Sequence, residues 1–156
     1  MTTKLWERTP RPRAVMIELK TAGEIELMRQ AGQVVAELLH HLAGMLRPGL
    51  KTKELDVAAR ELLRRRNAAP AVLGYRGFPA SVCVSINDEV VHGIPGERRI
   101  QDGDLVSVDA GAVVEGLYAD AATTVPVGAV STMGLRLMGT TQRALEAGIA
   151  QMVVGN

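Results

Sequence analysis

Two aspartates are the first residues of this chain whose spacing suggests chemistry. Asp109 and Asp120 are eleven residues apart, and apolar, partly β-branched runs surround both of them. In a two-residue hairpin, directly opposed residues differ by an odd number, so a turn at Val114-Glu115 would pair Asp109 with Asp120 on one face of the sheet. Like charges so placed repel each other, and the repulsion is relieved if one carboxylate is protonated or if the carboxylate oxygens bind a divalent cation. The spacing alone leaves two interpretations open, a solvated pair of aspartates near the strand ends and a metal site.

One histidine stands close enough in the sequence to join this pair. His92 precedes Asp109 by seventeen residues and opens the segment His92-Gly93-Ile94-Pro95, which is typical of a turn. Imidazole titrates near neutral pH, so His92 is a candidate for proton transfer or substrate contact. The spacing does not fix its distance from the aspartates, and an ordinary loop histidine is the alternative.

Helical patterns precede these segments. Thr21 and Glu24 have the spacing of a capping box, and Pro48-Gly49 ends the helix that follows. A second helix is expected to be capped by Thr52 and to end at Arg64-Arg65-Arg66. The first helix has apolar residues at spacings of three and four, namely Ile25, Met28, Ala31, Val35, Leu38, Leu42 and Met45.

The remaining elements place the aspartates on strands. Residues 82–86, 105–113 and 117–125 alternate or are β-branched and are predicted as strands, and Ser131 is expected to cap a third, amphipathic helix. Two helices, antiparallel strands and another helix indicate an α+β domain. We expect a basic, proline-rich arm in residues 1–15 and one domain in residues 16–156.

The composition excludes several classes of function. There are 18 Lys and Arg residues against 17 Asp and Glu, a formal net charge of +1, and aromatics make up only 3%, so specific nucleic-acid binding is not expected. There is no apolar run long enough for a membrane span, and the single cysteine allows no internal disulfide, so a cytoplasmic protein is expected. The arm is interpreted as a solvated leader, with docking to an acidic surface such as the ribosome as the alternative.

Several motifs, taken in order, closely resemble the type I methionine aminopeptidases of bacteria. The resemblance covers about residues 18 to 156. The segments that carry it are Gly74–Asn87, Val91–Pro95, Gly103-Asp104, Val108–Gly111 and Ala119–Ala122, with Glu24–Gly32 and Pro48–Asp56 matching the opening helices.

The resemblance implies a fold, an activity and a set of roles. The family has the pita-bread fold and uses two divalent metals, such as cobalt, manganese, iron, zinc or nickel, to remove the initiator methionine from nascent chains whose second residue is small. By resemblance, Asp109 binds one metal and Asp120 bridges both. His92 is then the catalytic histidine, which contacts the substrate and stabilises the transition state. Tyr75, Phe78 and Cys83 would line the methionine pocket.

Two departures from the family pattern limit this expectation. Arg76 stands where the family usually has histidine, and after Asp120 the chain offers a single acid, Glu146, and no histidine. The family takes one further histidine and two glutamates from a second half. We therefore expect the N-terminal half of a pita-bread fold plus one helix, with self-association through the uncovered half. A catalytically inactive relic or a peptide- or ribosome-binding module is the alternative, while the segment from Tyr75 to Cys83 argues against a proline-specific peptidase.

Overall fold

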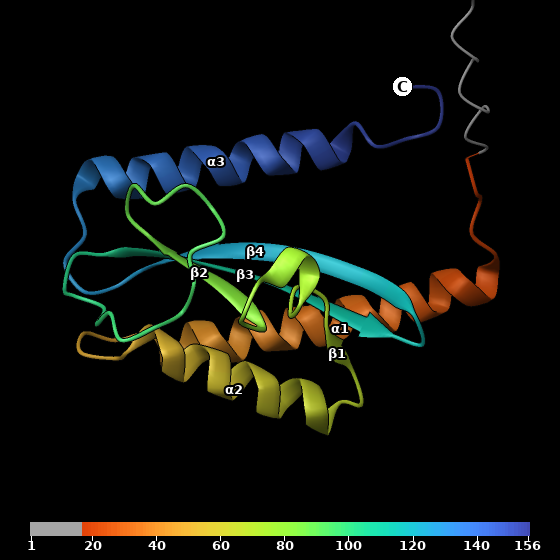
Figure 1. The fold of residues 1–156 in the computed structure, drawn as a ribbon. Helices are drawn as coiled ribbons and strands as arrows, with labels where there is room; N and C mark the ends of the chain where they lie inside the picture. Colours follow the sequence, from red (N-terminus) through yellow and green to blue (C-terminus); the bar gives the residue numbers. More distant parts are fainter. Residues whose placement is uncertain (1–16) are drawn as a thin grey trace, which may run out of the picture.

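The computed structural model describes residues 17–156, which form three helices and a four-stranded antiparallel sheet. Helices α1 and α2 lie along one side of the sheet and α3 lies on the other side (Figure 1). This arrangement confirms the predicted α+β class, whereas the predicted arm at residues 1–15 lies outside the described residues. In chain order the elements are α1 (Ala22–Met45), α2 (Thr52–Arg65), β1 (Ala69–Pro70), the 3-10 turn η1 (Tyr75–Gly77), β2 (Val82–Ile86), β3 (Leu105–Val114), β4 (Leu117–Pro126) and α3 (Thr132–Ala150).

Helix α1 begins at the predicted capping box. The Thr21 hydroxyl accepts the Glu24 N–H at 3.3 Å, and the Glu24 carboxylate accepts the Thr21 N–H at 2.7 Å. The apolar stripe is divided along its length, since Ile25 is 56% exposed, whereas Leu38 is fully buried. Only the C-terminal two thirds of this helix therefore anchor it to the sheet.

Strand β3 is the centre of the sheet. It pairs antiparallel with β4 over its full length, while β1 and β2 pair with its two ends along the opposite edge. Side chains alternate between the two faces of the sheet. The even-numbered residues of β2 and β3 form a buried layer against α1 and α2, namely Val82, Val84, Ile86, Val106, Val108, Ala110 and Ala112.

The odd-numbered residues of the same strands point away from α1 and α2. Between the apolar Leu105 and Val113 near the two ends of β3, this second face carries small or polar residues, namely Cys83, Ser85, Ser107, Asp109 and Gly111. The loop between β2 and β3 rises on this side toward α3 (Figure 1). The candidate chemistry therefore lies on the face opposite the helix pair.

The predicted register of the hairpin is wrong by one residue in the turn. Val114 pairs with Leu117, so the turn is Glu115-Gly116 and not Val114-Glu115. Both turn residues have positive φ, 48° for Glu115 and 80° for Gly116. A tight hairpin turn needs this geometry at both positions, and a β-branched valine resists it, whereas glycine adopts it without strain.

Helix α3 is capped by Ser131 as predicted, because the Ser131 hydroxyl accepts the Gly134 N–H at 3.1 Å. Its apolar face is not covered, since none of the residues of this described helix is buried. Leu145 and Ile149, for example, are 63% and 58% exposed. No helix within residues 17–156 combines the length and apolar character that a bilayer crossing requires.

Candidate metal centre

The two aspartates lie on the same face of the sheet, as predicted, but they are diagonal neighbours and not a direct pair. Asp120 is opposite Gly111, and Asp109 is opposite Ala122. A Cβ added to Gly111 would lie 2.8 Å from Asp120 Oδ2, so the Asp120 carboxylate lies directly over this glycine. Glycine at position 111 therefore leaves room for the carboxylate of Asp120 beside that of Asp109.

The pKa of Asp109 is affected by its surroundings, including the nearby Asp120. Partial burial raises the pKa of its carboxyl above the usual value, and the negative charge of Asp120 raises it further. The charge of His92 acts in the opposite direction on the same group. The pair thus carries negative charge that the described side chains compensate only in part, which is the condition under which a cation binds.

Cys83 and His92 complete a compact group around Asp109. Cys83 lies directly opposite Asp109 in the β2–β3 pairing. Its Sγ is 3.8 Å from Nδ1 of His92, and one ligand atom from each of the three residues lies within 4.8 Å of the others. Burial raises the pKa of the Cys83 thiol to about 11, with the charges of Asp109 and Asp120 acting in the same direction. His92 thus lies beside Asp109, and its role in catalysis stays a prediction.

His92 is positioned by the residue that follows it. The Val84 N–H donates to the Gly93 carbonyl at 2.9 Å, and the Gly93 N–H donates to Ser85 Oγ at 3.2 Å. A Cβ on Gly93 would lie 2.1 Å from the Val84 carbonyl oxygen, so only glycine allows this approach to β2. Val91 and His92 both have positive φ, 30° and 57°, as the chain turns over the strand.

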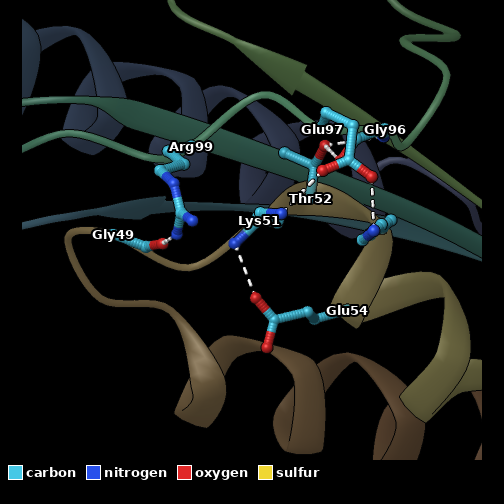
Figure 2. A network of polar contacts seen from close by, with 8 residues as sticks. Gly49, Lys51, Thr52, Glu54, Gly96, Glu97 and Arg99 are labelled. Carbon is cyan, nitrogen blue, oxygen red and sulfur yellow. Dashed lines mark hydrogen bonds and ion pairs between the residues drawn. The ribbon is translucent and has the colours of Figure 1, made fainter.

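The far side of this loop is fastened to the start of α2 (Figure 2). The Thr52 hydroxyl donates to the Gly96 carbonyl at 3.1 Å and accepts the Gly96 N–H at 2.8 Å. Thr52 is the first residue of α2 and not its cap, which corrects the sequence-based expectation. Lys51 is the cap residue, and its N–H is accepted by Glu54 at 2.8 Å. The buried Thr52 hydroxyl is used instead to hold the loop.

An exposed ion-pair group reinforces this attachment. The Glu97 carboxylate pairs with Lys51 at 2.7 Å and also with Lys53. Hydrogen bonds from these two lysines lower the pKa of Glu97 to about 2. The loop that carries His92 is therefore held at two places that follow His92. Gly93 bonds to β2, and Gly96 and Glu97 bond to the start of α2 (Figure 2).

The structure places the other predicted pocket residues on the segment before β2. Tyr75 lies in η1, is 65% exposed, and has the Arg76 guanidinium 5.5 Å from its ring centroid. Phe78 is half-buried just after η1, and Cys83 is buried on β2. Cys83 contacts His92. A common pocket for Tyr75, Phe78 and Cys83 stays a prediction.

Sequence reasoning missed the residues that support His92. Ser85 and Thr52 both use a hydroxyl to hold the loop, yet each looks in the sequence like an ordinary strand or helix-start residue. The only available signal for Ser85 was its odd-numbered position, which places it on the same face of β2 as Cys83. The direct opposition of Cys83 and Asp109 was also missed, because the long loop between β2 and β3 leaves their register open.

Comparison with known proteins places this geometry in context. Residues 26–156 match the profile of metallopeptidase family M24. The chain is 46% identical over 142 residues to methionine aminopeptidase 1 of Mycobacterium tuberculosis, covering 90% of this chain and 53% of that protein. It is 44% identical over 142 residues to the methionine aminopeptidase of Clostridium acetobutylicum, covering 90% of this chain and 57% of that protein.

A solved structure agrees with these similarities. The crystal structure of methionine aminopeptidase from Thermotoga maritima superposes with a TM-score of 0.85 at 40% identity, covering 88% of this chain and 55% of that one. This superposition confirms the predicted pita-bread class. The chain spans a little more than half the length of the relatives that it matches.

Proposed function

Because this chain belongs to metallopeptidase family M24, we propose that it acts in the release of N-terminal methionine from newly made polypeptides whose second residue is small. The observation that carries the proposal is the convergence of His92, Asp109 and Asp120 on one face of the sheet, in a chain that is 46% identical to a methionine aminopeptidase. The single thiol, which permits no internal disulfide, supports a cytoplasmic location.

The residues present fit a divalent metal. Asp109 and Asp120 offer carboxylate oxygens on one face of the sheet. Burial and then the negative charge of Asp120 raise the pKa of Asp109, and a bound cation would relieve that charge repulsion. Asp109 would hold one metal, and Asp120 would be shared between two. A metal pair supplies, when bound, Lewis-acid polarisation of the peptide carbonyl and a water of lowered pKa.

The side chains around the aspartates would bind and orient the peptide. Nδ1 of His92 faces the Cys83 thiol, which leaves Nε2 free to donate a hydrogen bond to the peptide or to hold a proton near the scissile bond. Cys83 with Phe78 and Tyr75 would form a soft, apolar surface for the methionine thioether. Arg76, beside Tyr75, adds a fixed positive charge at the rim and cannot act in proton transfer.

Metal binding is the first test of this proposal. Mn²⁺ binding to the metal-free chain is measured by the decrease of the electron paramagnetic resonance signal of free Mn²⁺. Asp109→Asn and Asp120→Asn should each weaken Mn²⁺ binding by tenfold or more, whereas Asp88→Asn, which changes an exposed aspartate at the start of the β2–β3 loop, should not change it. Equal binding by all four proteins, or binding by none, would remove the basis for the proposal.

Catalysis by residues 1–156 alone is expected to be weak or absent, which keeps a second function open. Oxygen-rich divalent sites take about six ligands, and Asp109 and Asp120 supply only two side chains. A catalytically inactive protein that binds peptides is the candidate that this ligand count favours. Methionine release from a Met-Gly peptide, measured during Mn²⁺ and Co²⁺ titration beside light scattering, separates the two. Robust turnover by a monodisperse monomer would contradict the ligand-count argument.

A further inference from the structure

A second set of metal donors lies beside the two aspartates and uses different chemistry. We propose that Cys83 Sγ, His92 Nδ1 and a carboxylate oxygen of Asp109 form a site for one thiophilic divalent cation, Zn²⁺ or Cd²⁺. This site differs from the pair formed by Asp109 and Asp120, because it has one sulfur, one nitrogen and one oxygen donor. The two sites share Asp109.

The distances suit a tetrahedral ion. With a Zn–S bond of about 2.3 Å and a Zn–N bond of about 2.0 Å, two ligands at the tetrahedral angle are about 3.5 Å apart. Cys83 Sγ and His92 Nδ1 are 3.8 Å apart, and the three ligand atoms lie within 4.8 Å of one another. A small movement of the exposed His92 ring would bring the donors to bonding geometry. The fourth position would face solvent or a substrate.

The donor types select the cation. Thiolate and imidazole favour zinc and its heavier analogue cadmium, whereas Mg²⁺ and Mn²⁺ prefer sites made of oxygen alone. Binding breaks the S–H bond of Cys83, forms a metal–sulfur bond and releases the proton to solvent, so no oxidant or reductant is required. The site would therefore take soft cations that an aspartate pair binds poorly.

The backbone already holds the three donors in place. Cys83 and Asp109 are directly opposed on paired strands. His92 is fixed by its neighbour Gly93, which exchanges hydrogen bonds with Val84 and Ser85 of β2. Cys83 thus lies on β2, Asp109 lies on its partner strand β3, and His92 is held against β2 through Gly93. Such preorganisation is what a functional metal site requires.

Sharing Asp109 makes the two sites compete. Cd²⁺ bound to Cys83, His92 and Asp109 would leave Asp120 without its neighbouring ligand, so Mn²⁺ would be displaced from the aspartate pair. This competition rests on the proposed function, whereas the soft-metal site itself does not. Zinc availability would then set how much of the protein can take a harder metal.

Ultraviolet absorption tests the site directly. Cd²⁺ added to the reduced, metal-free chain should produce a thiolate-to-cadmium charge-transfer band at one equivalent. Cys83→Ser should abolish the band, and His92→Ala should weaken Cd²⁺ affinity by about tenfold or more. His41→Ala, an exposed histidine on α1, is the matched control and should leave the band unchanged. Absence of the band in the unaltered chain, or an unchanged titration in His92→Ala, would overturn the proposal.

A further variant separates this inference from the proposed function. Asp120→Asn should keep the Cd²⁺ band, because Asp120 is not one of its ligands, and should still weaken Mn²⁺ binding. If Mn²⁺ fails to bind the unaltered chain but the band forms, the proposed function fails and the soft-metal site stands. If Mn²⁺ stays bound while the band reaches completion, the shared role of Asp109 is wrong. His92→Ala changes an exposed side chain, so circular dichroism should show an unchanged fold.

Discussion

The two faces of the central sheet carry side chains of different kinds. On the face toward α1 and α2, Val84, Val106 and Val108 are 0–3% exposed and belong to the hydrophobic core. On the other face, one residue along the same strands, lie Ser107 and Asp109, with hydroxyl and carboxylate groups. Because side chains alternate along a strand, one residue packs in the core while the next points its polar group to the opposite face. Substitutions on the two faces should therefore change different properties.

The largest expected effect is on the helix-facing side. Ile86→Ala removes a side chain that is 1% exposed, and it should lower the free energy of unfolding by about 2–5 kcal/mol. Thr124→Ala on the other face removes an exposed hydroxyl bonded to Ser107, and it should cost about 1 kcal/mol or less. Urea unfolding of both variants measures the difference. Equal losses of unfolding free energy in the two variants would mean that the two faces contribute equally to stability.

A smaller effect of opposite sign is expected on the polar face. Burial and the charge of Asp120 both raise the pKa of Asp109. Asp120→Asn removes the second cause, so without metal the variant should be more stable by about 0.2–1 kcal/mol. A raised carboxyl pKa means stability that is present at low pH and lost as pH rises through the pKa of Asp109. The free energy of unfolding of Asp120→Asn should therefore fall less than that of the unaltered chain as pH rises through this range. Urea unfolding in chelator across acidic pH is the measurement, and a destabilised variant would contradict this account.

The smallest effect concerns the ion pairs that hold the loop over the polar face. The folded pKa of Glu97 is about 2, below its ordinary value, so its stabilisation is present above the ordinary carboxyl pKa and is lost as pH falls through about 2. Glu97→Gln should lower the melting temperature slightly at neutral pH and by less in acid. Added salt should also reduce the gap, because the group is exposed. A gap that is constant with pH would rule out this linkage.

The helix-facing side was largely predictable from the sequence. The capping box at Thr21, the apolar stripe of α1 and the β-branched runs of β2 and β3 each point to one structure, and the burial of Leu38 and Val108 follows from them. Periodicity determines which face of an element is apolar. It does not determine how a polar face is assembled, because that depends on register and loop conformation.

The polar face shows where such reasoning fails. The alternation of side chains along strands correctly placed Asp109 and Asp120 on one face of the sheet. The predicted register was wrong because Glu115-Gly116 was not recognised as the turn that tolerates positive φ at both positions. The contact between Cys83 and His92 depends on a loop that doubles back with positive φ at two residues. No pattern of hydrophobic residues indicates such a path.

The close approach of Gly93 to β2 has a consequence for how this chain can change over generations. Every single-nucleotide change of a glycine codon that gives a different amino acid adds a Cβ, and at position 93 that atom would meet the Val84 carbonyl oxygen at 2.1 Å. At Gly96, in the same loop, the nearest atom to an added Cβ is 3.9 Å away. Mutational drift can therefore pass through codon 96 far more freely than through codon 93. The position of His92 therefore depends on a glycine that no other amino acid can replace without a clash with β2.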